Sequence, residues 1–123
     1  MAVSTEREAI VATVRDYVDG WFDGDAGRME RALHPELVKR SYRAEDGGPR
    51  RLETLTAEAM IGYTAAGWGV QQDVPDRGIV ITVEYEAEHI AAVTCLCHCY
   101  VDLLHLVRTP EGWRIVNVVW CPR

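Results

Sequence analysis

The first half of the chain repeats its hydrophobic residues at helical spacing. Between residues 5 and 23 apolar positions recur every three or four residues, and Gly24 then stops the pattern. These apolar positions are Ile10, Val11, Val14, Tyr17, Val18, Trp21 and Phe22. Asp25 can cap a second, short helix that ends before Pro35, and Thr56 can cap a third helix. The pattern therefore predicts three helices before residue 70.

The second half of the chain changes to a period of two, which is typical of strands. This period predicts strands over 78–86, 90–97, 100–108 and 113–121, and two earlier strands are predicted over 37–43 and 51–55. The connections between the last four strands are too short for crossover helices, so we expect an antiparallel meander. Helices followed by a meander indicate one α+β domain that covers residues 1–123.

Asp102 is the residue that most limits a functional interpretation. It lies inside the apolar strand predicted over 100–108, where aspartate is disfavoured. A buried carboxylate costs several kcal/mol unless it is hydrogen-bonded or protonated. Asp102 therefore lies either on the wet face of the sheet or in a pocket. In a dry pocket, loss of hydration would raise its pKa.

Charge and composition narrow the class of protein. The net charge is −6, and Lys39 is the only lysine, so no basic stripe for nucleic acid is present. No apolar run approaches the length of a membrane span, and we see no secretory signal core near Glu6, so we expect a cytoplasmic protein with no membrane contact. Its four cysteines are then expected as thiols.

The segment Cys95-Leu96-Cys97-His98-Cys99 invites a metal interpretation. Structural zinc sites place a turn between paired ligands, whereas alternate residues of a strand point the same way without one. Free cysteines are also among the most buried residues. We therefore expect buried structural thiols and no metal site.

The order of elements resembles the nuclear transport factor 2-like superfamily. The resemblance rests on Tyr17 to Asp25, on Ala32-Leu33-His34-Pro35, and on Asp102 to Leu106 together with Gly112 to Asn117. It is strongest to the SnoaL-like and putative lumazine-binding proteins of that superfamily. The resemblance implies a cone-shaped fold, in which three N-terminal helices pack in a strongly bent, mainly antiparallel sheet. It also implies a pocket at the open end, a homodimer through the outer face of the sheet, and no cofactor.

The same resemblance assigns roles to polar residues. The resemblance to the ketosteroid isomerases of the superfamily aligns Tyr17 and Asp102 with the two neutral donors that stabilise an enolate oxygen in those enzymes. Those enzymes are also a standard example of an aspartic acid that is kept protonated. The general base of those enzymes falls near Tyr42, where no carboxylate stands, so steroid isomerisation is not expected. Asp102 could instead be a structural carboxylate. His98 is the candidate acid or base of a dehydratase-type reaction, if it lines the pocket.

Large side chains complete the expected site. They are Trp21, Tyr42, Met60, Tyr63, Trp68 and Trp120. In a small fold such groups are usually core, but in this superfamily the corresponding positions form the walls and mouth of the cone. Trp68, between two glycines, could act as a lid.

Three functions remain open from the sequence. The leading interpretation is a protein that binds a small apolar or aromatic molecule. The second is a cofactor-free isomerase, dehydratase or cyclase that uses Tyr17 and Asp102. The third is a scaffold that binds another protein through the outer sheet face. That face, which we also expect to form the dimer, is predicted to carry Leu103, His105, Val107, Trp113, Ile115 and Val119.

Overall fold

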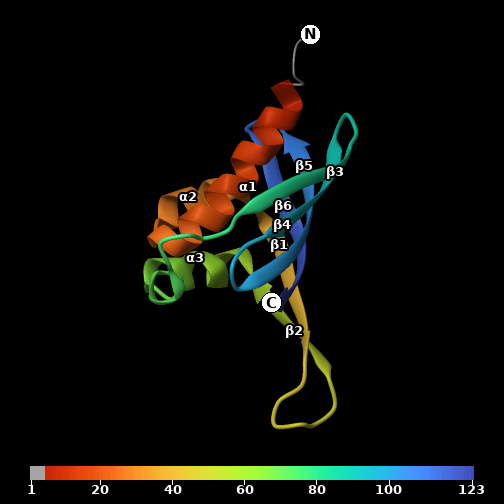
Figure 1. Cartoon of the computed structure of the whole chain (residues 1–123). Coiled ribbons are helices and arrows are strands. Elements are labelled where there is room, and N and C mark those ends of the chain that lie inside the picture. The colour runs from red at the N-terminus through yellow and green to blue at the C-terminus, as the bar shows by residue number, and fades with distance from the viewer. Residues whose placement is uncertain (1–4) are drawn as a thin grey trace.

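A computed structural model describes residues 5–123 and contains three helices and a six-stranded sheet. The elements are α1 (Thr5–Asp23), α2 (Ala26–Ala32), β1 (Leu33–Arg43), β2 (Arg51–Thr56), α3 (Ala57–Ala65), the 3-10 turn η1 (Val70–Gln72), β3 (Val80–Glu86), β4 (Ile90–Leu96), β5 (Tyr100–Thr109) and β6 (Gly112–Pro122). The strand order is β2-β1-β6-β5-β4-β3. Figure 1 shows the helices gathered on one side of a curved sheet.

The predicted fold class is confirmed, with one addition to the topology. Strands β3 to β6 form the expected antiparallel meander, and β1 and β2 pair as an antiparallel hairpin. The addition is that β1 runs parallel to β6 and joins the hairpin to the meander. This pairing brings a strand from the first half of the chain beside the last strand. The sheet is therefore mixed, although most of its pairs are antiparallel.

Local signals account for the ends of the helices. Gly24 adopts a positive φ of 68°, which suits glycine, directly after α1. The Asp25 side chain accepts a hydrogen bond from the Arg28 amide at 3.1 Å, and Thr56 accepts one from the Ala59 amide at 3.1 Å. These two caps satisfy amides that would otherwise be unpaired at the starts of α2 and α3. None of the helices within residues 5–123 is long and apolar enough to span a membrane.

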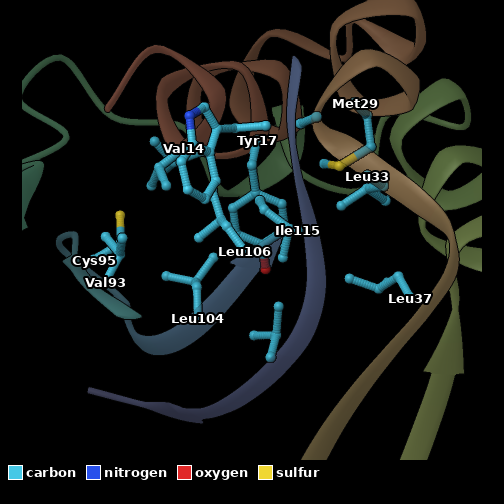
Figure 2. Packing of buried hydrophobic residues seen from close by; sticks show 14 of the residues in the cluster. Val14, Tyr17, Met29, Leu33, Leu37, Val93, Cys95, Leu104, Leu106 and Ile115 are labelled. Atoms are coloured by element: carbon cyan, nitrogen blue, oxygen red, sulfur yellow. The ribbon is translucent and has the colours of Figure 1, made fainter. Parts of the chain in front are cut away.

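The hydrophobic core lies between α1 and the concave face of the sheet. Figure 2 shows Tyr17 projecting from α1 towards Leu104 and Leu106 of β5. The side chains of Ile10, Val14 and Phe22 on α1 are also almost completely buried. The face of α1 that the periodicity predicted is thus the face that packs on the sheet.

A β-bulge in β6 corrects the predicted outer face. His105 pairs with Asn117, but Leu106 pairs with Ile115, so Val116 is an extra residue in β6. The extra residue reverses the alternation, and Trp113 and Ile115 are buried at 3% and 0% exposure instead of facing outward. Leu103, His105 and Val119 are exposed as predicted, and Val107 is half-buried. A similar irregularity near the end of β3 leaves Tyr85 exposed, although strict alternation would place it on the same face as Ile79, Ile81 and Val83.

Candidate ligand-binding site

A pocket of about 390 Å³ opens between the end of α1, the helix α3 and the strands β1, β5 and β6. Its apolar wall includes five of the six large residues proposed from the sequence, namely Trp21, Met60, Tyr63, Trp68 and Trp120. Its polar lining consists of Tyr17, Lys39, Ser41, Arg43, Glu53, Gln72, Tyr100 and Asp102. An apolar cavity with a few convergent polar groups is the usual form of a small-molecule site.

Three of these polar residues form a hydrogen-bonded chain at the inner end of the site. The Tyr17 hydroxyl donates to Asp102 Oδ2 at 2.5 Å, and Lys39 Nζ donates to the Tyr17 oxygen at 2.6 Å. Tyr17 and Asp102 are buried at 4% and 6% exposure, so their polar atoms depend on protein partners. The structure confirms the expected contact between Tyr17 and Asp102 and adds Lys39 to it.

The three hydrogen-bonded residues come from three separate elements of secondary structure. Tyr17 lies on the sheet-facing side of α1, and Asp102 pairs with Trp120 in the β5–β6 ladder. Lys39 reaches the same place because β1 runs beside β6, where Lys39 pairs with Val118. Alternation along β1 places Lys39 and Ser41 on the same side of the strand, and both line the pocket. The sequence did not assign Lys39 a role, although its being the only lysine of the chain was a usable signal.

The pKa values of these hydrogen-bonded residues follow from their burial and from their opposite charges. Burial lowers the pKa of the Lys39 ammonium, and the negative charge of Asp102 partly opposes that change. Burial, followed by the charge of Asp102 and the hydrogen bond to it, raises the pKa of the Tyr17 hydroxyl well above 10.0. Lys39 Nζ also lies 5.1 Å from the centre of the Tyr17 ring and 5.2 Å from that of the Trp120 ring. Cation–π contacts of this kind favour the charged amine.

This geometry differs from a pair of donors aimed at one ligand oxygen. The Tyr17 proton points at Asp102, and the Tyr17 oxygen accepts from Lys39. Of the three residues, Lys39 has donors left, since an ammonium carries three protons and one is used here. A ligand at the inner end of the pocket would therefore meet the Lys39 amine first.

Gln72 ties the mouth of the pocket together. Its Oε1 accepts from Trp21 Nε1 at 3.0 Å and from the Tyr100 hydroxyl at 2.5 Å. Trp68 is 52% exposed and stacks on Tyr63 with ring centroids 4.2 Å apart. The aromatic side chains at the mouth therefore come from α1, α3, the loop after α3 and the start of β5.

Two proposed site residues lie outside the lining. Tyr42 is 58% exposed, because it alternates with Ser41 and Arg43, whose side chains face the pocket. His98 lies in the β4–β5 turn, where its Nε2 contacts the Gln72 carbonyl at 3.0 Å and its ring lies 5.3 Å from that of Phe22. Glu53, which the sequence did not single out, reaches the lining because it pairs with Ser41 across the β1–β2 hairpin.

The β4–β5 turn brings three possible metal ligands closer than the sequence argument allowed. The ligand atoms of Cys97, His98 and Cys99 all lie within 4.8 Å of one another. The strand argument assumed that these residues alternate, but residues 97 to 99 form the turn itself. His98 Nδ1 is buried without a hydrogen-bond partner among the described residues. Two thiols and an imidazole are a donor set that zinc or copper(I) accepts.

The described geometry has the architecture of the nuclear transport factor 2-like class. An NTF-2 like protein of unknown function from Silicibacter pomeroyi DSS-3 matches with a TM-score of 0.74 and 19% identity over 100% of both chains. A structure titled as a putative ketosteroid isomerase, from Shewanella frigidimarina NCIMB 400, matches with a TM-score of 0.59 and 17% identity over 95% of this chain and 98% of its own. Identities this low show the fold alone.

The family assignment comes from a family model. The model described as "Putative lumazine-binding" matches residues 5–121, so the chain belongs to that family. The chain has no significant match among curated proteins. A further structural match, titled as a putative Ca/calmodulin-dependent kinase II association domain from Exiguobacterium sibiricum 255-15, has a TM-score of 0.68 and 12% identity over 100% of this chain and 97% of its own.

Proposed function

We propose that this protein binds a small, partly aromatic molecule in the pocket between α1, α3 and the sheet. The observation that carries the proposal is the combination of an aromatic wall with a polar inner end formed by Lys39, Tyr17 and Asp102. A volume of about 390 Å³ lies near the lower end of the range for small-molecule sites, roughly 300–1,000 Å³. The ligand would place its ring among Trp21, Trp120 and Tyr63 and its polar group at Lys39.

Tryptophan fluorescence and thermal unfolding test this proposal directly. Three of the four tryptophans line the pocket, so a bound ring should change their emission. We would titrate aromatic carboxylates, phenols and aromatic aldehydes and expect at least one class to raise the melting temperature. A ligand at 100 times its Kd stabilises the folded state by about 2.7 kcal/mol.

A pair of tyrosine variants supplies a matched control for this titration. Tyr63→Ala removes an aromatic group from the wall and should weaken binding. Tyr42→Ala removes the same group from an exposed position outside the lining and should leave binding unchanged. Equal effects of the two variants, or saturable binding that Tyr63→Ala leaves intact, would count against this pocket.

The presence of Glu53 keeps a cofactor-free isomerase, dehydratase or cyclase as a second candidate. A carboxylate in the lining could act as the base that the position of Tyr42 does not provide, while Lys39 and Tyr17 stabilise the resulting enolate. Exchange of the acidic α-protons of a bound ketone in D₂O, followed by NMR, tests this function. Exchange should depend on Glu53, and a Glu53→Gln variant with an unchanged rate would remove this candidate.

We also infer self-association through the outer face of the sheet. Leu103 and Val119 pair across β5 and β6 and are 51% and 41% exposed. Val80 on β3 is 55% exposed, and its row across the sheet continues through Leu96 and Val101 to Cys121. A second copy of the chain would cover this patch, and a different protein partner is the alternative occupant.

A further inference from the structure

Lys39 has an unusual position for a lysine. It is the only lysine among 123 residues, and it lines a pocket instead of extending into water. Its side chain lies between the rings of Tyr17 and Trp120, with Nζ 5.1 and 5.2 Å from their centres. Lysines on the polar face of a strand keep their amines hydrated, so the position of Lys39 calls for a chemical explanation.

The surroundings of the amine favour nucleophilic chemistry over simple pairing of charges. The carboxylate of Asp102 is bonded to the Tyr17 hydroxyl, and Lys39 contacts the far side of that hydroxyl, so no direct Lys39–Asp102 ion pair is formed. Burial lowers the pKa of Lys39, which increases the fraction of neutral amine near pH 8. The Lys39 side chain is partly buried in a largely apolar pocket, and desolvation of an amine in such a pocket is one of the arrangements that activate a lysine towards carbonyl groups.

We propose that Lys39 is a nucleophile that forms an imine with an aldehyde or ketone bound in the pocket, with Tyr17 as its proton carrier. This inference rests on the proposed function and names the chemical class of its ligand. An aromatic aldehyde would stack its ring beside Trp120 and present its carbonyl carbon to Nζ. The aromatic lining and the single amine are both used by such a ligand.

The reaction needs no further reactant. The neutral amine attacks the carbonyl carbon, a C–N bond forms, and the carbonyl π electrons move to oxygen. A proton passes from nitrogen to that oxygen through the Tyr17 hydroxyl, with Asp102 taking and returning a proton at the other end of the chain. The nitrogen lone pair then forms the C=N bond and the C–O bond breaks, while the second nitrogen proton passes to the departing oxygen by the same route, so that water leaves with both protons of the amine. The sum is amine plus carbonyl giving imine plus water.

Trapping by reduction followed by mass spectrometry tests the proposal. The folded protein is incubated with benzaldehyde and sodium cyanoborohydride, which reduces an imine to a stable secondary amine. The peptide that contains residue 39 is then compared with the peptide that carries the α-amine of the chain. We expect Lys39 to be benzylated at least about tenfold faster in the folded protein than in the urea-unfolded chain.

Variants separate the proposed chemistry from simple accessibility. Tyr17→Phe keeps the ring and removes the proton carrier, so it should slow labelling of Lys39 and leave labelling of the α-amine unchanged. Lys39→Arg should abolish the pocket adduct and leave labelling of the α-amine unchanged. Binding alone is followed in the wild-type protein by the fluorescence quenching that 2-naphthoate causes, since this aromatic compound has no aldehyde or ketone group. Circular dichroism establishes that each variant is folded.

The outcomes distinguish the imine from the binding site itself. Binding of 2-naphthoate in the pocket, combined with labelling of the α-amine alone, would overturn the imine and leave the proposed function standing. Labelling of Lys39 at the same rate in the folded and the unfolded chain would also overturn it. Failure of both binding and labelling would remove both proposals.

Discussion

Lys39 Nζ lies 2.6 Å from the Tyr17 oxygen, at the opposite end of the hydroxyl from Asp102. The contact changes the meaning of the buried aspartate. A buried carboxylate whose only partner is a tyrosine would be tolerated only in its neutral form. A carboxylate that is linked through a hydroxyl to a cation has its charge balanced nearby. The stability of the site therefore depends on three residues together.

A double-mutant cycle measures that dependence. Asp102→Leu leaves the Tyr17 hydroxyl without its buried acceptor, and it should lower the free energy of unfolding by about 1–3 kcal/mol. Lys39→Met leaves Asp102 buried without a cation and should cost a similar amount. The double variant removes both charges and should be more stable than the sum of the two losses predicts. Urea unfolding at pH 7 gives all four values.

Additive losses would show that Lys39 and Asp102 do not interact. Asp102→Asn provides the conservative comparison, since it keeps the shape of the side chain and a hydrogen-bonding oxygen. We expect it to cost less stability than Asp102→Leu and to retain most of the ligand binding that Asp102→Leu abolishes.

The buried acids predict a loss of stability in alkaline solution. Burial raises the pKa of the Cys95 thiol from 9.0 to about 12, so above pH 9 the unfolded chain releases protons that the folded chain retains. Stability should therefore fall as the pH rises from 9 to 12. The contribution of Cys95 has an upper bound of about 4 kcal/mol, at 1.36 kcal/mol per pKa unit. The raised pKa of Tyr17 likewise lowers stability as the pH rises above 10.0.

Lys39 has the opposite effect on the pH dependence of stability from that of Cys95 and Tyr17. Its pKa is lowered in the folded state, so the unfolded chain binds more protons between that value and 10.5, and stability rises with pH across this interval.

Urea midpoints measured from pH 7 to pH 11 should fall less steeply in Cys95→Ala than in the wild type. Identical profiles in the two proteins would contradict the assignment to Cys95.

Cysteine reactivity should divide the four thiols. Cys121 is exposed, whereas Cys95 and Cys97 are buried and burial raises the pKa of Cys99 to about 12. Because the thiolate is the reactive form, iodoacetamide at pH 8 should alkylate Cys121 first and the other three after unfolding. Peptide mapping over time gives the order. Rapid alkylation of Cys95 would mean that the core beneath α1 opens easily.

The outer face of the sheet predicts a dimer at micromolar concentration. Leu103→Asp would place a charge at the centre of the proposed interface without touching the pocket, since Leu103 faces away from it. Sedimentation equilibrium should then show a monomer for the variant and a dimer for the wild type. Glu88→Gln, at an exposed position in the β3–β4 turn, is a control that should remain dimeric. A monomeric wild type would contradict the interface.

Arg77 joins the end of α1 to the loop before β3. Its guanidinium lies 2.8 Å from Asp19, 2.6 Å from Asp23 and 2.8 Å from Asp73. Networks of partly buried ion pairs exceed isolated surface pairs in strength, so Arg77→Gln should lower the free energy of unfolding by about 1–2 kcal/mol. Half-molar salt should reduce the difference. Arg51→Gln, at an exposed position on β2, should change stability by less than about 0.5 kcal/mol.

The element order and the Tyr17–Asp102 contact could be predicted, because both rest on local patterns and on a resemblance. Lys39 could not be placed, since its position depends on β1 pairing in parallel with β6, about 80 residues later. The outward assignment of Trp113 and Ile115 failed because nothing in the sequence marks Val116 as a bulge. The strands predicted over 90–97 and 100–108 already left a turn at 98–99, but the approach of Cys97, His98 and Cys99 within that turn depends on side-chain positions that the sequence pattern does not give.

The bulge at Val116 divides the final strand into two segments that contact different parts of the molecule. Before the bulge, Trp113 and Ile115 are buried, and Trp113 Nε1 donates to Glu6 in the first turn of α1 at 2.6 Å. After it, Val118 and Trp120 face the concave side, where Trp120 forms a pocket wall. Substitutions in the later segment can change what the pocket accepts while the earlier segment keeps the helix anchored. The last strand thus holds α1 with one set of side chains and lines the pocket with another.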